Sequence, residues 1–122
     1  MERRTYGYAA LRHVWDGRMC NIGAVVHSAE RHFFHLRSLR HGDLVRRLRD
    51  VPREEIERVE RELWALKAAG RAGRQEPGLL ERLARQGTGR VALGTAHRGS
   101  AQRLRWALDQ HFRDYAHPEI LD

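Results

Sequence analysis

The sequence has 122 residues, the length of one domain that can bury a hydrophobic core of its own. Its 23 lysine and arginine residues exceed the 16 aspartate and glutamate residues by 7, which excludes an acidic metal-buffering protein and makes a polyanionic partner a reasonable hypothesis. Lys67 is the one lysine, and such a preference for arginine is also typical of GC-rich genomes. The net charge therefore suggests a class of partner without identifying it.

Cysteine content and hydropathy favour a protein of the reducing cytoplasm. Cys20 is the one cysteine, so no disulfide can form within the chain. The first residues lack the apolar segment of a signal peptide, and no apolar run approaches the roughly 18 residues that a membrane span needs. We therefore expect a cytoplasmic protein without a membrane span.

The first third of the chain predicts an antiparallel meander. Residues 5–15 and 18–27 have the composition of strands, and Asp16-Gly17 between them is typical of a two-residue hairpin turn. A turn at 28–31 leads to a third strand at 32–39.

The two-residue turn also predicts a register for this meander. The expected pairs in the first hairpin are Trp15 with Arg18, His13 with Cys20, Leu11 with Ile22, Ala9 with Ala24, Tyr8 with Val25 and Tyr6 with His27. In the second hairpin, His27 is expected opposite His32, Val26 opposite Phe33 and Val25 opposite Phe34.

After the meander the hydrophobic period becomes helical, which predicts three helices over residues 44–50, 53–70 and 77–86. Asp43 is the expected cap of the first helix and Pro52 begins the second. Gly70 and Gly87 are the expected stops of the second and third helices.

A fourth strand at 90–97 and a final helix at 100–115, capped by Ser100, complete the predicted order βββ–ααα–β–α. The expected fold class is α+β. It consists of an antiparallel sheet of three early strands and one late strand, packed with about four helices in a single domain, 1–122.

Two segments of the first hairpin carry a specific pattern, Tyr6 to Ala9 (YGYA) and Asn21 to Val26 (NIGAVV). In this order they resemble the domain-of-unknown-function 3037 family, with a looser similarity from 83 to the final helix. Trp15 stands where that family usually has proline, and Cys20 replaces an isoleucine, valine or aromatic residue. The family has no assigned activity or catalytic residues. Its genes often neighbour those of HipA-like kinases, which implies a small accessory protein with such a kinase as its partner.

The hairpin contains a candidate interaction patch. Gly23 within a strand permits close approach of another backbone, and Asn21 beside it suits either a recessed binding patch next to Tyr6 and Tyr8 or a bulge that lets a helix pack closely. The bulge is the simpler interpretation.

Histidine pairs provide two further candidates. His27 and His32, as cross-strand neighbours, could hold a metal ion, although no third ligand is predicted and a solvated strand end explains them as well. His13 opposite Cys20 could form an imidazole–thiolate pair, but no orienting carboxylate or amide is predicted on the same face. We therefore expect no metal, no cofactor and no catalytic residue.

The segment from His97 to Ser100 lies where a strand is expected to lead into the last helix. Backbone N–H groups at a helix start, with His97 and Arg98 beside them, could bind a phosphate or carboxylate. An ordinary helix start capped by Ser100 is the alternative.

Aromatic residues on two helices mark candidate interaction surfaces. Arg103, Trp106 and Arg113 fall on one side of the last helix, away from its apolar face, where they could contact a protein or stack on a base, or where Trp106 could instead be core. Trp64 is a second exposed candidate, and His111 is expected as a hydrogen-bonded core histidine.

These features favour a non-enzymatic accessory or interaction protein over a nucleic-acid-binding module with arginine-rich segments. Arginines of the middle helix alternate with glutamates, so they offer no continuous track for a polyanion. The excess positive charge lies in 37–49 and 82–105, and a nucleic-acid surface requires these two segments to meet.

Overall fold

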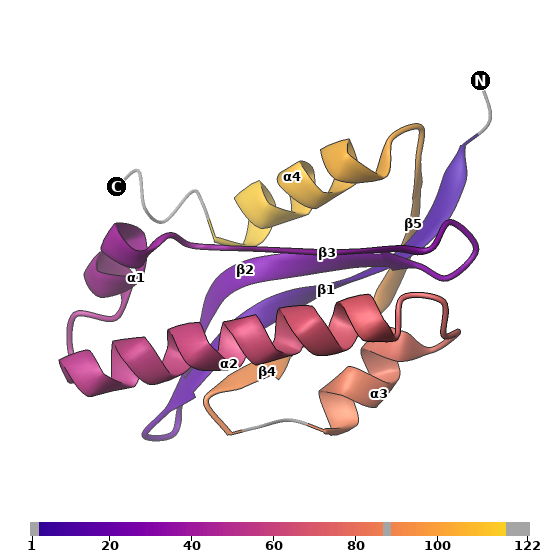
Figure 1. Ribbon diagram of the computed structural model, residues 1–122. Helices are drawn as coiled ribbons and strands as arrows, with labels where there is room; N and C mark the ends of the chain where they lie inside the picture. Colours follow the sequence, from indigo (N-terminus) through magenta and orange to yellow (C-terminus); the bar gives the residue numbers. More distant parts are fainter. Residues whose placement is uncertain (1–2, 87–88, 117–122) are drawn as a thin grey trace.

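One antiparallel sheet with helices on both faces forms the protein (Figure 1), in a computed structural model that describes residues 3–86 and 89–116. The strands are β1 (Arg4–Trp15), β2 (Arg18–Ser28), β3 (Phe33–Ser38), β4 (Val91–Leu93) and β5 (His97–Ala101). The helices are α1 (His41–Arg47), α2 (Arg53–Ala72), α3 (Leu79–Arg85) and α4 (Leu104–Tyr115). The predicted α+β class is confirmed. No helix among the described residues is long and apolar enough to cross a membrane.

The sheet has the strand order β3-β2-β1-β4, and β5 also pairs with β1. Helix α4 covers one face, and α2 and α3 cover the other (Figure 1). Side chains alternate between the two faces of the sheet along β1, so Tyr6 points to His111 of α4 and His13 points to Glu55 of α2. The largest fully buried side chains belong to the strands and to the first three helices: Leu11, Ile22, Val25, Val26, Leu44, Val59 and Leu79.

The first hairpin keeps its predicted register only near the turn. Trp15 faces Arg18 and His13 faces Cys20, which confirms two of the expected pairs. A β-bulge between Leu11 and Arg12 then shifts the ladder by one residue. The remaining predicted pairs are wrong, because Leu11 faces Gly23, Ala9 faces Val25, Tyr8 faces Val26 and Gly7 faces His27.

The second hairpin is displaced by two residues from its predicted register. His27 faces Phe34 and Val26 faces His35, so the predicted pairing of His27 with His32 is wrong. His32 lies in the turn with a φ of 52°, a left-handed conformation that takes it out of the ladder.

Two predicted helix signals have different roles in the structure. The residue before α1 is Arg40, so Asp43 lies within the first turn rather than at the cap. Helix α2 begins after Pro52 as expected but continues past Gly70 to Ala72. Gly87, the expected stop of α3, lies outside the described residues.

The late part of the sheet also differs from the prediction. In place of one strand at 90–97 there are two short strands, β4 and β5, which pair with opposite ends of β1. Ser100 lies in β5, and α4 begins only at Leu104. Residues such as Ser100, which helix-capping rules assign to the start of the last helix, therefore belong to the sheet.

Gly70 is a point of close contact between α2 and the sheet. It is buried, and a Cβ atom built on it would lie 2.1 Å from Cε1 of Phe34 in β3. The Phe34 ring therefore occupies the space that any side chain at position 70 would need, and the missing side chain allows α2 to lie close to β3.

We predict that Gly70→Ala destabilises the protein by about 1–3 kcal/mol, because the added methyl group forces the buried Phe34 ring to move. The matched control is Gly42→Ala in α1, where an added Cβ atom would have nothing within 4 Å and the same change should stabilise by up to about 1 kcal/mol. Urea unfolding measures both. Equal stability of Gly70→Ala and the parent chain would contradict the packing described above.

Candidate binding groove at the sheet edge

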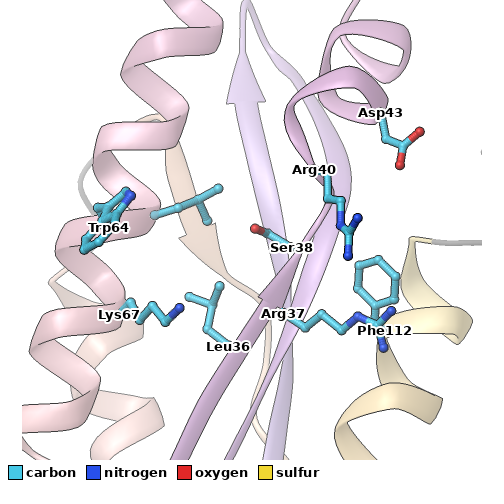
Figure 2. A pocket seen from close by; sticks show the side chains of 9 residues that line it. Leu36, Arg37, Ser38, Arg40, Asp43, Trp64, Lys67 and Phe112 are labelled. Carbon is cyan, nitrogen blue, oxygen red and sulfur yellow. The ribbon is translucent and has the colours of Figure 1, made fainter.

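A groove of about 610 Å³ follows β3 between α2 on one side and α1 and α4 on the other (Figure 2). Its lining combines apolar and charged side chains from four elements and the loop before α1: Leu36, Arg37, Ser38, Arg40, Asp43, Leu63, Trp64, Lys67 and Phe112.

Strand β3 forms the floor of this groove, and among the described strands it lies at the edge of the sheet. The N–H of Leu39 donates to the carbonyl of Ile22 at 2.9 Å, so this residue directs its backbone groups towards β2. Backbone direction alternates along an antiparallel ladder. The N–H and C=O groups of Phe34, Leu36 and Ser38 therefore point away from β2, towards the open edge.

Apolar side chains form part of the groove walls. Leu63 is buried, whereas the neighbouring Trp64 is 77% exposed although it is one of the largest apolar side chains in the chain. On the other wall, Phe112 of α4 packs under the guanidinium of Arg37, whose Cζ lies 4.4 Å from the ring centroid. An exposed tryptophan beside a groove with both apolar and charged side chains is typical of a binding site.

Positive charge predominates in the groove. Arg37 forms an ion pair with Asp109, and Asp43 accepts a hydrogen bond from Arg46 at 2.6 Å. Arg40 and Lys67, in contrast, form no ion pair with a carboxylate of the described residues. An anionic partner would therefore find two cations here whose charge is not already neutralised.

The cationic environment continues along β3 to His35. Burial lowers the pKa of His35, and the positive charges of Arg105, Arg71 and Lys67 lower it further. Arg105 belongs to the second basic segment of the sequence, and the first basic segment begins at Arg37 in the same strand as His35. Positive charges from both segments thus lie near β3.

Tyr6 and Tyr8 belong to an aromatic cluster between β1 and α4. The Tyr6 hydroxyl is hydrogen-bonded to Nε2 of His111 at 2.8 Å, and the His111 ring stacks on Tyr8 at 3.7 Å. Burial raises the pKa of Tyr6 and lowers that of His111. His111 is the hydrogen-bonded packing histidine that we expected, whereas Tyr6 is 8% exposed and offers little surface to a partner.

Asn21 and Gly23 flank the bulge in the first hairpin, in agreement with the structural interpretation of this segment. A Cβ atom on Gly23 would lie 2.3 Å from the carbonyl oxygen of Arg37. The glycine therefore permits close approach of β3, not of a helix as expected.

His27 and His32 are not the cross-strand pair on which the predicted metal site rests. The Nε2 atom of His27 is hydrogen-bonded to the carbonyl oxygen of Arg74 at 2.9 Å, and His32 lies in the turn. No group of three potential metal ligands occurs among the described residues.

His13 and Cys20 are cross-strand neighbours, as predicted, but their side chains have other partners. His13 is 2% exposed, and its Nε2 atom is 2.9 Å from Oε2 of the buried Glu55, which Arg90 also contacts at 2.9 Å. The Cys20 thiol contacts the Asn21 carbonyl and the Arg47 guanidinium. The imidazole is thus hydrogen-bonded to Glu55 and is not part of an imidazole–thiolate pair.

His97, Arg98 and Ser100 lie in β5 and not at a helix start, so the geometry behind the predicted anion site is wrong. Successive side chains of a strand point to opposite faces, which separates His97 from Arg98. The hydroxyl and carbonyl of Ser100 accept hydrogen bonds from Arg3 at 3.2 and 2.6 Å.

Trp106 is 60% exposed on α4, which favours the surface alternative over the core one. The Arg103 guanidinium covers its ring at 4.6 Å from the centroid. Arg113 is exposed on the same helix. These three residues line no part of the groove along β3.

Sequence reasoning identifies Trp64 but misses most of the groove, including Leu36, Arg40 and Lys67. One sequence signal could have indicated this wall of the groove. Lys67, the one lysine, follows Trp64 by about one helical turn, so the two side chains lie on the same side of α2. The burial of Glu55 is missed as well, because a carboxylate in the first turn of a helix suits an exposed position equally well.

Comparisons with known proteins give no relative. No family model matches the chain, and neither a curated protein nor a solved structure shows significant similarity to it. The resemblance to the domain-of-unknown-function 3037 family therefore stays a prediction.

We predict that acidification destabilises the fold. Burial is the main cause that lowers the pKa values of His27, His35 and His111 below the ordinary value of 6.5. The unfolded chain then binds more protons than the folded one, so stability is complete above about pH 6.5 and is lost as pH falls through the lowered pKa values. Urea unfolding at about pH 7 and about pH 5 measures this loss.

The variant His35→Gln should reduce that loss, because it removes one of the three groups that take up a proton on unfolding. A chain equally stable at both pH values would contradict the prediction.

Proposed function

We propose that this protein is a non-enzymatic interaction protein that binds an acidic segment of a partner protein in the groove along β3. One observation carries the proposal: a sheet edge lies between walls of mixed apolar and charged side chains, and two of the cations there have no carboxylate partner among the described residues. Open sheet edges and exposed tryptophans favour aggregation, so a surface that binds no partner gains nothing from either feature.

Affinity and selectivity would come from different parts of the groove. Leu36 and Trp64 offer apolar surface whose removal from water stabilises a complex. Arg40 and Lys67 offer charge that accelerates association with an acidic partner and disfavours a basic one.

Binding fits the described residues better than catalysis does. The one predicted nucleophile pair is not assembled, because His13 is bonded to Glu55 and Cys20 contacts Arg47. The small hollow that His13 and Cys20 share measures about 160 Å³, far less than the groove along β3.

A HipA-like kinase, the partner implied by the family resemblance, is the first protein to test for binding. Nucleic acid is the alternative partner. Two features of α4 weigh against it: Arg103 covers the Trp106 ring on which a base would stack, and Asp109 and Asp114 alternate with the arginines.

We predict that the double substitution Arg40→Glu and Lys67→Glu weakens binding of an acidic probe by about tenfold or more, because attraction becomes repulsion at two positions in the groove. The probe is a fluorescein-labelled peptide of alternating glutamate and valine, and fluorescence anisotropy with the full chain measures its dissociation constant.

The matched control is the double substitution Arg58→Glu and Arg61→Glu, which reverses two exposed charges on α2 outside the groove lining. Position 58 is nine residues before Lys67, half a turn away around the helix axis. Equal weakening by the control would show a general charge effect and contradict the proposal, as would a parent chain that does not bind the peptide.

A further inference from the structure

We infer that the groove takes its partner as an extended segment that adds to the sheet as a new strand beside β3, with acidic side chains towards Arg37 and Arg40. This inference rests on the proposed function and specifies the conformation of the bound segment. Its evidence is the direction of the backbone N–H and C=O groups of β3, whereas side-chain contacts alone would satisfy the proposed function.

The floor of the groove is a row of backbone groups and not only of side chains. The groups of Phe34, Leu36 and Ser38 face outward, as the Leu39 to Ile22 hydrogen bond and the ladder require. A donor and an acceptor therefore alternate along an edge of six residues, or about 20 Å. An extended peptide presents the complementary alternation, whereas a helix has already used its backbone groups.

The two walls would contact the two faces of an added strand. Phe34 and Leu36 point to the α2 side of the sheet, as the contact of Phe34 with Gly70 shows, and Arg37 points to the α4 side. A segment that alternates apolar and acidic residues can thus direct one set towards Leu36 and Trp64. The other set then lies near Arg37 and Arg40, on the other side of Figure 2.

Charge selects an acidic partner over a second copy of this chain. A second β3 edge would bring its own Arg37, Arg40 and Lys67 opposite the first set, and the like charges would repel. A single-stranded nucleic acid has the required negative charge but no amide row to match the donors and acceptors of the floor. An acidic peptide satisfies both requirements.

The test compares the glutamate–valine probe with two N-methylated forms, one methylated at every valine and one at every glutamate. In a strand, the amides of these two sets point to opposite edges, so only one set can donate to β3. We expect one methylated peptide to bind about tenfold or more weakly than the parent and the other to bind nearly as well. Amide hydrogen exchange of the full chain should also slow at Phe34, Leu36 and Ser38 when the parent peptide binds.

A second variant tests the same edge from the protein side. Ser38→Pro removes one outward N–H while leaving the ladder with β2 intact, so the chain should fold and bind the peptide more weakly. Equal binding of all three peptides would overturn strand addition while leaving the proposed function in place, and equal weakening by both methylations would also overturn it. Failure of the parent peptide to bind, or displacement of it by an equimolar single-stranded oligonucleotide, would overturn both.

Discussion

The close approach of α2 to β3 at Gly70 is the contact on which the rest of the candidate site depends. Because no side chain separates the helix from the Phe34 ring, the preceding turns of α2 lie directly beside the edge strand. Those turns carry Lys67 and Trp64, one and two helical turns before the glycine. A larger residue at position 70 would move this wall outward, so a packing requirement in the core sets the width of a surface groove.

The bulge in the first hairpin has a similar indirect effect. Side-chain direction in β2 depends on register, and the shift between Leu11 and Arg12 exchanges the faces to which its residues point. His27 consequently faces the α2 side and is bonded to the Arg74 carbonyl, just beyond the end of that helix. A hairpin without the bulge would direct His27 towards α4, where the cluster around His111 already fills the space.

Local rules predict the α+β class and most elements, because strand composition, the Asp16-Gly17 turn and helical periodicity act within a few residues. They fail where distant residues compete. Gly70 has the sequence signal of a helix stop, but in the structure it packs against Phe34 within the helix. Ser100 has the signal of a helix cap, but it pairs with β1 as part of the sheet. Glu55 suits an exposed helix start, yet its carboxylate is buried in contact with His13 and Arg90. Local rules also miss the groove, because its walls come from α2 and α4, which lie far from β3 in the sequence.

The composition of the chain gives the groove one further property. Lys67 is the one lysine among 122 residues, and its amino group lies on the groove wall beside Trp64. Any acetylation, ubiquitination or other acyl transfer to a lysine of this sequence must therefore occur at that wall. Such a modification would remove a positive charge at the same time as it adds bulk. Covalent regulation through lysine would thus act on the groove itself, because the sequence has no second lysine that could be modified instead.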